Sequence, residues 1–94
     1  MKNTLVFLHG FLGTKEDWNE IISYLEPKYN CFALDLPGHG STPYCEDWEE
    51  DIFEEIADFS TPIHLIGYSM GGRVAMRLID KYPKIFAKKI FNNL

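Results

Sequence analysis

"GYSMGGR", residues 67–73, decides the fold. It follows the apolar run IHLI at 63–66 and leads into VAMRLIDKY at 74–82, where apolar residues recur at helical spacing. A serine between two glycines at a strand-to-helix junction is typical of a sharp turn that strains the serine backbone and exposes its hydroxyl above a sheet. Glycine is expected at Gly67 and Gly71 because a Cβ atom has little room at either position. The segment therefore predicts that Ser69 is a catalytic nucleophile.

Three apolar runs are predicted to be buried strands. They are TLVFLHG at 4–10, CFALDLPG at 31–38 and PIHLIGYS at 62–69. The tail KIFAKKIFNNL at 84–94 is compatible with either a further strand or a helix. With about three strands, the third run is expected to form an open apolar edge, which is a hazard for pairing and aggregation.

Three helical segments are predicted between and after these strands. Thr14 is the expected N-cap of the first, with Asp17 three residues later, and Pro27 and Pro83 mark the ends of the first and third. The apolar faces are formed by Trp18, Ile21, Ile22 and Leu25, then Trp48, Ile52, Phe53 and Ile56, then Val74, Ala75, Leu78 and Ile79. Strands alternating with helices imply a parallel sheet with right-handed crossovers, an α/β layer architecture.

Composition indicates one soluble globular domain, since 46% of the 94 residues are hydrophobic and 24% are charged. No apolar run is long enough to cross a membrane, and the N-terminus does not have the pattern of a signal peptide, so a cytoplasmic protein without membrane partners is expected. Cys31 and Cys45 have no metal-ligand spacing and suit a reducing compartment. No metal and no cofactor are expected.

The net charge of -5 is unevenly distributed along the chain. Eight of the fourteen acidic residues lie between Glu46 and Asp58, which is most simply the solvated face of a helix. No lysine or arginine occurs between Lys28 and Arg73, so no basic stripe could follow a phosphate backbone. Nucleic acid is therefore excluded as an expected partner.

A second segment, LHGF at residues 8–11, belongs to the same predicted site. It ends the first strand, and its loop could bring the Phe11 main-chain N–H to the pole of the sheet where the helix after Ser69 begins. Paired with the N–H of Met70, it would supply two donors for a developing negative oxygen. His9 is expected to be structural rather than a general base.

Three motifs follow one another along the chain: LHGF with Trp18 downstream, DLPGHG at 35–40 and GYSMGG at 67–72. Their order and spacing resemble the N-terminal part of an α/β-hydrolase-fold protein. The resemblance extends from about Leu5 to Pro83. The string GYSMGGRVA resembles one branch, the 2-succinyl-6-hydroxy-2,4-cyclohexadiene-1-carboxylate (SHCHC) synthases of menaquinone biosynthesis, which eliminate pyruvate. The resemblance implies a three-layer fold and a catalytic serine, Ser69, acting as base. It also implies main-chain donors at Phe11 and Met70 and a pocket lined by Tyr68.

Arg73 has a physical argument of its own. It lies four residues after Ser69, one helical turn along, so both side chains can share one side of the helix. An arginine there can bind a carboxylate through two parallel hydrogen bonds, which suits a small polycarboxylate substrate. The alternative is an exposed arginine that is unpaired or bound to a nearby acid.

The partners of Ser69 are not found within reach in this chain. The family order is serine, then acid, then histidine, but the 25 residues after Ser69 contain only Asp80 and no histidine. Asp80 and His64 are each roughly 16 Å away along a helix and a strand, and His39 belongs to a loop-shaping turn. Residues 1–94 are therefore expected to be the N-terminal portion of a single domain that lacks the lid and C-terminal part, with a complementing C-terminal fragment as a candidate partner.

Three functions remain open at this point. The first is the carbon-oxygen elimination of the synthase branch, and the second is hydrolysis of carboxylic esters on the same scaffold, for which Arg73 would be incidental. The third is a non-catalytic remnant or interaction module. For the 94 residues alone inactivity is favoured, because a serine without base or acid has only the oxyanion donors to act with.

Overall fold

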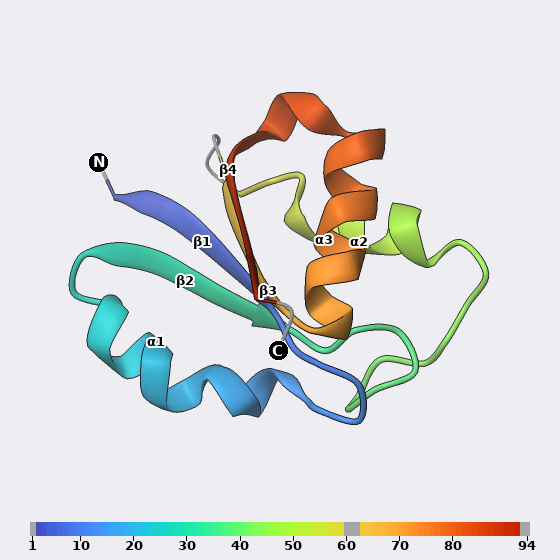
Figure 1. The fold of residues 1–94 in the computed structure, drawn as a ribbon, viewed down its shortest axis with the longest axis horizontal. Coiled ribbons are helices and arrows are strands. Elements are labelled where there is room, and N and C mark those ends of the chain that lie inside the picture. Colours follow the sequence, from blue (N-terminus) through green and yellow to red (C-terminus); the bar gives the residue numbers. More distant parts are fainter. Residues whose placement is uncertain (1, 60–62, 93–94) are drawn as a thin grey trace.

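The structure is a computed structural model that describes residues 2–59 and 63–92, with only the main chain described over 87–92. Four strands form one parallel sheet in the order β2-β1-β3-β4 (Figure 1). The strands are β1 (Asn3–Leu8), β2 (Tyr29–Leu34), β3 (Ile63–Tyr68) and β4 (Phe86–Asn92). The helices are η1 (Lys15–Trp18), α1 (Asn19–Leu25), α2 (Trp48–Ile56), α3 (Met70–Lys81) and η2 (Pro83–Ile85). Pro62 of the expected third strand and the last two residues of the tail lie outside the described residues.

The helices cover the two faces of the sheet unequally. Helices α2 and α3 pack on one face and α1 lies against the other (Figure 1). Side chains alternate along β1, so Val6 and Leu8 join the core under α2 and α3 while Phe7 points the other way and contacts Trp18, with ring centroids 5.0 Å apart. No residue of α1 is fully buried, and Ile21 is 47% exposed. The main core therefore lies between the sheet and α2 and α3.

The predicted fold class is confirmed, and the predicted helices are found with shifted boundaries. The main-chain N–H of Thr14 donates to the Asp17 carboxylate at 3.2 Å, as expected for an N-terminus, but the first turn is a 3-10 helix that passes into α1 at Asn19. The second strand begins two residues before the predicted start and ends at Leu34, because Asp35 already turns into a hydrogen-bonded loop.

The expectation that the third strand is an open edge is wrong. β4 pairs with β3 in parallel from Ile63 to Tyr68, with a register shift between Ile63 and His64. The ambiguous tail is therefore a strand, and Phe86 at its start is buried in the core. Pairing with β4 satisfies the main-chain groups of β3 and places this strand inside the sheet.

The topology places one crevice at the carboxyl ends of the central strands. β1 leads to α1 on one face, whereas its neighbour β3 leads to α3 on the other face (Figure 1). Where adjacent parallel strands send their connections to opposite faces, a crevice forms that is the usual ligand site of open α/β sheets. The loop after β1 and the turn at Ser69 meet at this point. In the described part of the chain, no helix has both the length and the apolar character needed to span a bilayer.

Candidate functional site

Ser69 lies at a strained turn between β3 and α3. Its φ of 53° and ψ of -112° fall outside the regions that ordinary residues favour. Its carbonyl oxygen accepts the N–H groups of Gly72 and Arg73 at 2.9 and 3.2 Å, so α3 begins immediately after it. No hydrogen bond between a described residue and the Ser69 hydroxyl is present, and the side chain is half-buried. The geometry leaves this hydroxyl available at the mouth of the crevice.

Both glycines around Ser69 lie where the main chain approaches closely. A Cβ on Gly67 would lie 2.6 Å from the Gly72 nitrogen, and one on Gly71 would lie 2.6 Å from the His9 carbonyl oxygen and would collide with that of Leu8. The first turn of α3 therefore rests directly on the end of β1. The N–H of Met70 opens this helix and has no carbonyl partner one turn earlier, so it is available to an anionic oxygen.

His9 fastens the loop after β1 and has no free nitrogen for proton transfer. The ring is buried, and its Nε2 accepts the main-chain N–H of Leu36 at 2.9 Å. Nε2 is therefore unprotonated, so Nδ1 carries the proton and donates it to the Gly10 carbonyl at 2.7 Å. The ring, which is hydrogen-bonded through both of its nitrogens, has the geometry of a structural histidine.

Asp35 is a buried acid whose contacts were not predicted from the sequence. Its carboxylate accepts the Lys15 N–H at 2.8 Å and both the N–H and the hydroxyl of Ser41 at 3.1 Å. These bonds, first of all the one from Lys15, hold the Asp35 pKa below its ordinary value against the opposing effect of burial. The signal in the sequence was Gly40, which has a φ of 54° and no space for a Cβ beside the Asp35 carboxylate.

The remaining candidate partners of Ser69 are placed elsewhere. His39 Nδ1 lies 3.2 Å from the Pro37 carbonyl oxygen, and the His39 ring packs against those of His9 and Phe11 with centroids 5.0 and 5.9 Å apart. His64 lies on β3, and Asp80 lies near the opposite end of α3. Within residues 2–59 and 63–92, no group of three His, Cys, Asp or Glu side chains is arranged to hold a metal ion.

Two mostly apolar clefts flank the turn at Ser69. One of about 290 Å³ is lined by His9, Gly10, Asp17, Trp18, Ile21 and Tyr68. The other, of about 240 Å³, is lined by Leu36, Pro37, Tyr44, Trp48, Met70 and Val74. The Tyr68 ring, 43% exposed, lies against Gly10, where an added Cβ would come within 2.9 Å of it. Tyr68 therefore lines the first cleft.

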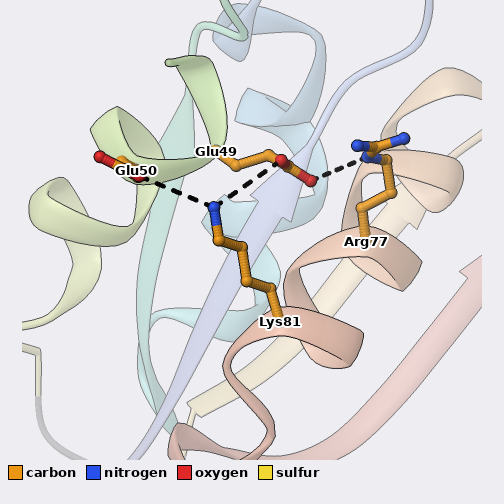
Figure 2. A network of polar contacts seen from close by, with 4 residues as sticks. All are labelled: Glu49, Glu50, Arg77 and Lys81. Carbon is orange, nitrogen blue, oxygen red and sulfur yellow. Dashed lines mark hydrogen bonds and ion pairs between the residues drawn. The ribbon is translucent and has the colours of Figure 1, made fainter.

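The two arginines of α3 have different surroundings. Arg77 donates to Glu49 of α2 at 2.8 Å, and Lys81 lies 4.0 Å from Glu49 and 3.8 Å from Glu50 (Figure 2). This pairing lowers the pKa of Glu49 and raises that of Arg77. Arg73 is exposed and makes no ion pair within the described residues. Among the described residues, the arginine of α3 nearest to Ser69 is thus the one without a carboxylate partner.

Comparison with known proteins agrees with the fold. Residues 5–92 match the model of the alpha/beta hydrolase family. The chain is 40% identical over 85 residues to the 2-succinyl-6-hydroxy-2,4-cyclohexadiene-1-carboxylate synthase of Enterobacter sp. (strain 638), covering 84% of this chain and 33% of that protein. It is 42% identical over 82 residues to the pimeloyl-[acyl-carrier protein] methyl ester esterase of Legionella pneumophila (strain Lens), covering 84% and 33%.

Among solved structures, MenH from S. aureus superposes with a TM-score of 0.85 at 30% identity, covering 95% of this chain and 36% of that one. The chain thus spans about a third of the length of the curated relatives it matches. The synthase and the esterase are similar to it to nearly the same degree, so overall identity does not separate elimination from ester hydrolysis.

Proposed function

Since the chain belongs to the alpha/beta hydrolase family, we propose that it carries the nucleophile and anion-binding part of a site that forms SHCHC by eliminating pyruvate. Ser69 acts as the base that removes the proton, and the N–H groups of Phe11 and Met70 stabilise the oxyanion. Tyr68 lines the pocket, and Arg73 binds a carboxylate of the substrate. The similarity to the Enterobacter synthase supports this reaction class.

The observation that carries the proposal is that the exposed guanidinium of Arg73 makes no ion pair with any side chain that the structure describes. Arg77, on the same helix, is paired with Glu49 of α2, so the neighbouring helix supplies an acid to Arg77. The product SHCHC bears two carboxylates by its chemical name, and the substrate carries the same two because only pyruvate leaves. A planar guanidinium matches a carboxylate with two parallel hydrogen bonds. A neutral ester offers no such partner.

Arg73→Ala tests the proposal by direct binding. Hydrogen bonds to charged groups contribute about 1.5–3 kcal/mol, so removing the guanidinium should weaken SHCHC binding roughly 10- to 150-fold, with the exposure of Arg73 favouring the lower end. Arg77→Ala is the matched control and should leave the dissociation constant within about twofold. The measurement is an NMR titration of the amide signals of this chain with SHCHC. Equal effects of the two substitutions would show that Arg73 does not bind the carboxylates of SHCHC.

A second candidate is ester hydrolysis, favoured by the similarity to the Legionella esterase and by the apolar lining of both clefts beside Ser69. An uncharged substrate such as methyl hexanoate would bind through apolar contact and would be insensitive to Arg73→Ala. The same titration with methyl hexanoate separates the candidates. Tight ester binding that Arg73→Ala leaves unchanged, together with absent SHCHC binding, favours the esterase.

Turnover further requires an acid and a histidine in reach of Ser69, and we propose that a complementing C-terminal polypeptide supplies them. His9, His39 and Asp35 are hydrogen-bonded elsewhere, and His64 lies near the start of β3, five residues before Ser69. We expect slow labelling of Ser69 by a fluorophosphonate in this chain alone and rapid labelling once the C-terminal two-thirds of the Enterobacter relative is added. Rapid labelling of the chain alone would contradict the need for a partner.

A further inference from the structure

Two buried titratable groups beside the crevice take no part in the proposed chemistry. His9 is 1% exposed and Asp35 is 8% exposed, and each forms a hydrogen bond with a main-chain N–H group of the neighbouring loop, His9 with Leu36 and Asp35 with Lys15. Both connect the segment after β1 to the segment after β2. Their contacts lie at the two ends of the stretch that contains Phe11.

The first contact fixes the beginning of that stretch. His9 is the residue that follows β1, and its ring joins the Leu36 N–H to the Gly10 carbonyl. The second contact fixes the end, because the Lys15 N–H donates to Asp35 at 2.8 Å. Residues 10–14 are therefore anchored at both ends, through His9 to Leu36 and through Lys15 to Asp35.

The side chain of Phe11 supplies little anchoring of its own. It is 70% exposed, and its aromatic neighbour is His39, at a centroid distance of 5.9 Å. The next residue, Leu12, is 80% exposed and has a φ of 64°, a conformation that an ordinary residue adopts only when its surroundings impose it. The bond from the Gly13 N–H to the Gly10 carbonyl, at 3.0 Å, closes the turn locally but does not attach it to the rest of the fold.

We propose that Asp35 and His9 are positioning residues that hold the main chain of Phe11 in place beside the turn at Ser69. The inference rests on the proposed function, in which the Phe11 N–H is an oxyanion donor. Such a donor stabilises charge only if it is oriented before the charge develops, because reorganisation during the reaction would consume the gain. The two hydrogen-bonded ends supply that order, and Gly71, packed on the carbonyls of Leu8 and His9, ties the same loop to α3.

Lys15→Pro removes the main-chain N–H that donates to Asp35 and leaves the Asp35 carboxylate in place. Lys15 is the first residue of η1, a position that accepts proline, and Thr14 before it is extended with φ -143° and ψ 171°. Lys15→Ala is the matched control, since it removes the side chain but keeps the N–H that Asp35 accepts. The readout is the backbone ¹⁵N order parameter of Phe11 and Leu12 in the whole chain, with the amides of Val6 and Leu8 reporting the core.

In the parent and in Lys15→Ala we expect order parameters near those of rigid backbone, about 0.85, at Phe11 and Leu12. In Lys15→Pro the order parameters of Phe11 and Leu12 should fall toward about 0.6, while those of Val6 and Leu8 stay at about 0.85. If the proline and alanine variants behave alike, the inference is overturned. Should the proline unfold the chain, Asp35→Ala, which removes both acceptor oxygens, decides in the same way: a loosened Phe11 supports the inference, and a rigid one overturns it. No substrate is involved, so failure of SHCHC binding would reject the proposed function and leave this result intact.

Discussion

The strained backbone of Ser69 should lower the stability of the chain, and comparing the variants Ser69→Ala and Ser69→Gly should reveal this cost. Ser69→Ala keeps the Cβ, and with it the strain of a φ of 53° and ψ of -112°, which costs about 1–3 kcal/mol for an ordinary residue. Ser69→Gly removes that strain, but the greater freedom of glycine in the unfolded chain lowers the free energy of unfolding by about 0.5–1 kcal/mol. We therefore expect the glycine variant to be more stable than the alanine variant by about 0.5–2 kcal/mol, or roughly 4–8 °C in Tm per kcal/mol.

Urea unfolding followed by far-ultraviolet circular dichroism measures this difference. Glu54 is the matched control because it is exposed, lies within α2 and has an ordinary helical backbone. There the order should reverse, with Glu54→Ala more stable than Glu54→Gly by about 1 kcal/mol. If Ser69→Ala is at least as stable as Ser69→Gly, the turn is not strained and the reasoning from its dihedral angles fails.

Two further predictions concern the packing around this turn. Gly71→Ala should destabilise the chain by about 1–3 kcal/mol in the same urea assay, because its Cβ would meet main-chain carbonyls of Leu8 and His9 that cannot rotate away; an unchanged midpoint would contradict the close approach. Asp35→Asn should lower stability at pH 7, and its deficit should shrink as the pH falls below about 4, the ordinary pKa of an aspartate. The sign follows from a folded-state Asp35 pKa below the unfolded value, so the stabilisation is complete above the unfolded pKa and is lost as the pH falls through the folded one. Urea midpoints from pH 7 to pH 3 test this, and a deficit that does not vary with pH would refute it.

The fold class and the position of the turn at Ser69 follow from local patterns in the sequence. Ile63 and Leu65 alternate on the buried side of β3, and Ala75 and Leu78 recur at helical spacing on α3, so periodicity alone distinguishes the two elements. The resemblance extends over nearly the whole matched range, 5–92. Patterns of this kind are readable because each depends only on neighbours in the chain.

What the sequence did not predict depends on contacts between distant segments. The tail from Phe86 has two lysines amid apolar residues and fits no period, yet pairing with β3 makes it a strand. Asp35 lies twenty residues from Lys15, so no local pattern announces their hydrogen bond. The clearest sign of it was a glycine, Gly40, whose missing side chain leaves room for the carboxylate. Long-range pairings of this kind decide which groups surround Ser69.

The start of α3 breaks several rules of helix stability at once. Ser69 has a positive φ without being glycine, and Gly71 and Gly72 occupy the first turn at a cost of about 1 kcal/mol each. That turn contains no acid, and Arg73 follows it near the positive end of the helix dipole, a placement that costs a few tenths of a kcal/mol or more. A bound carboxylate would reverse the last two effects, because it would pair with the guanidinium and face the free N–H groups. Departures from local rules concentrate where function requires them, and an anion bound above Ser69 would offset two of these, the missing acid and the position of Arg73.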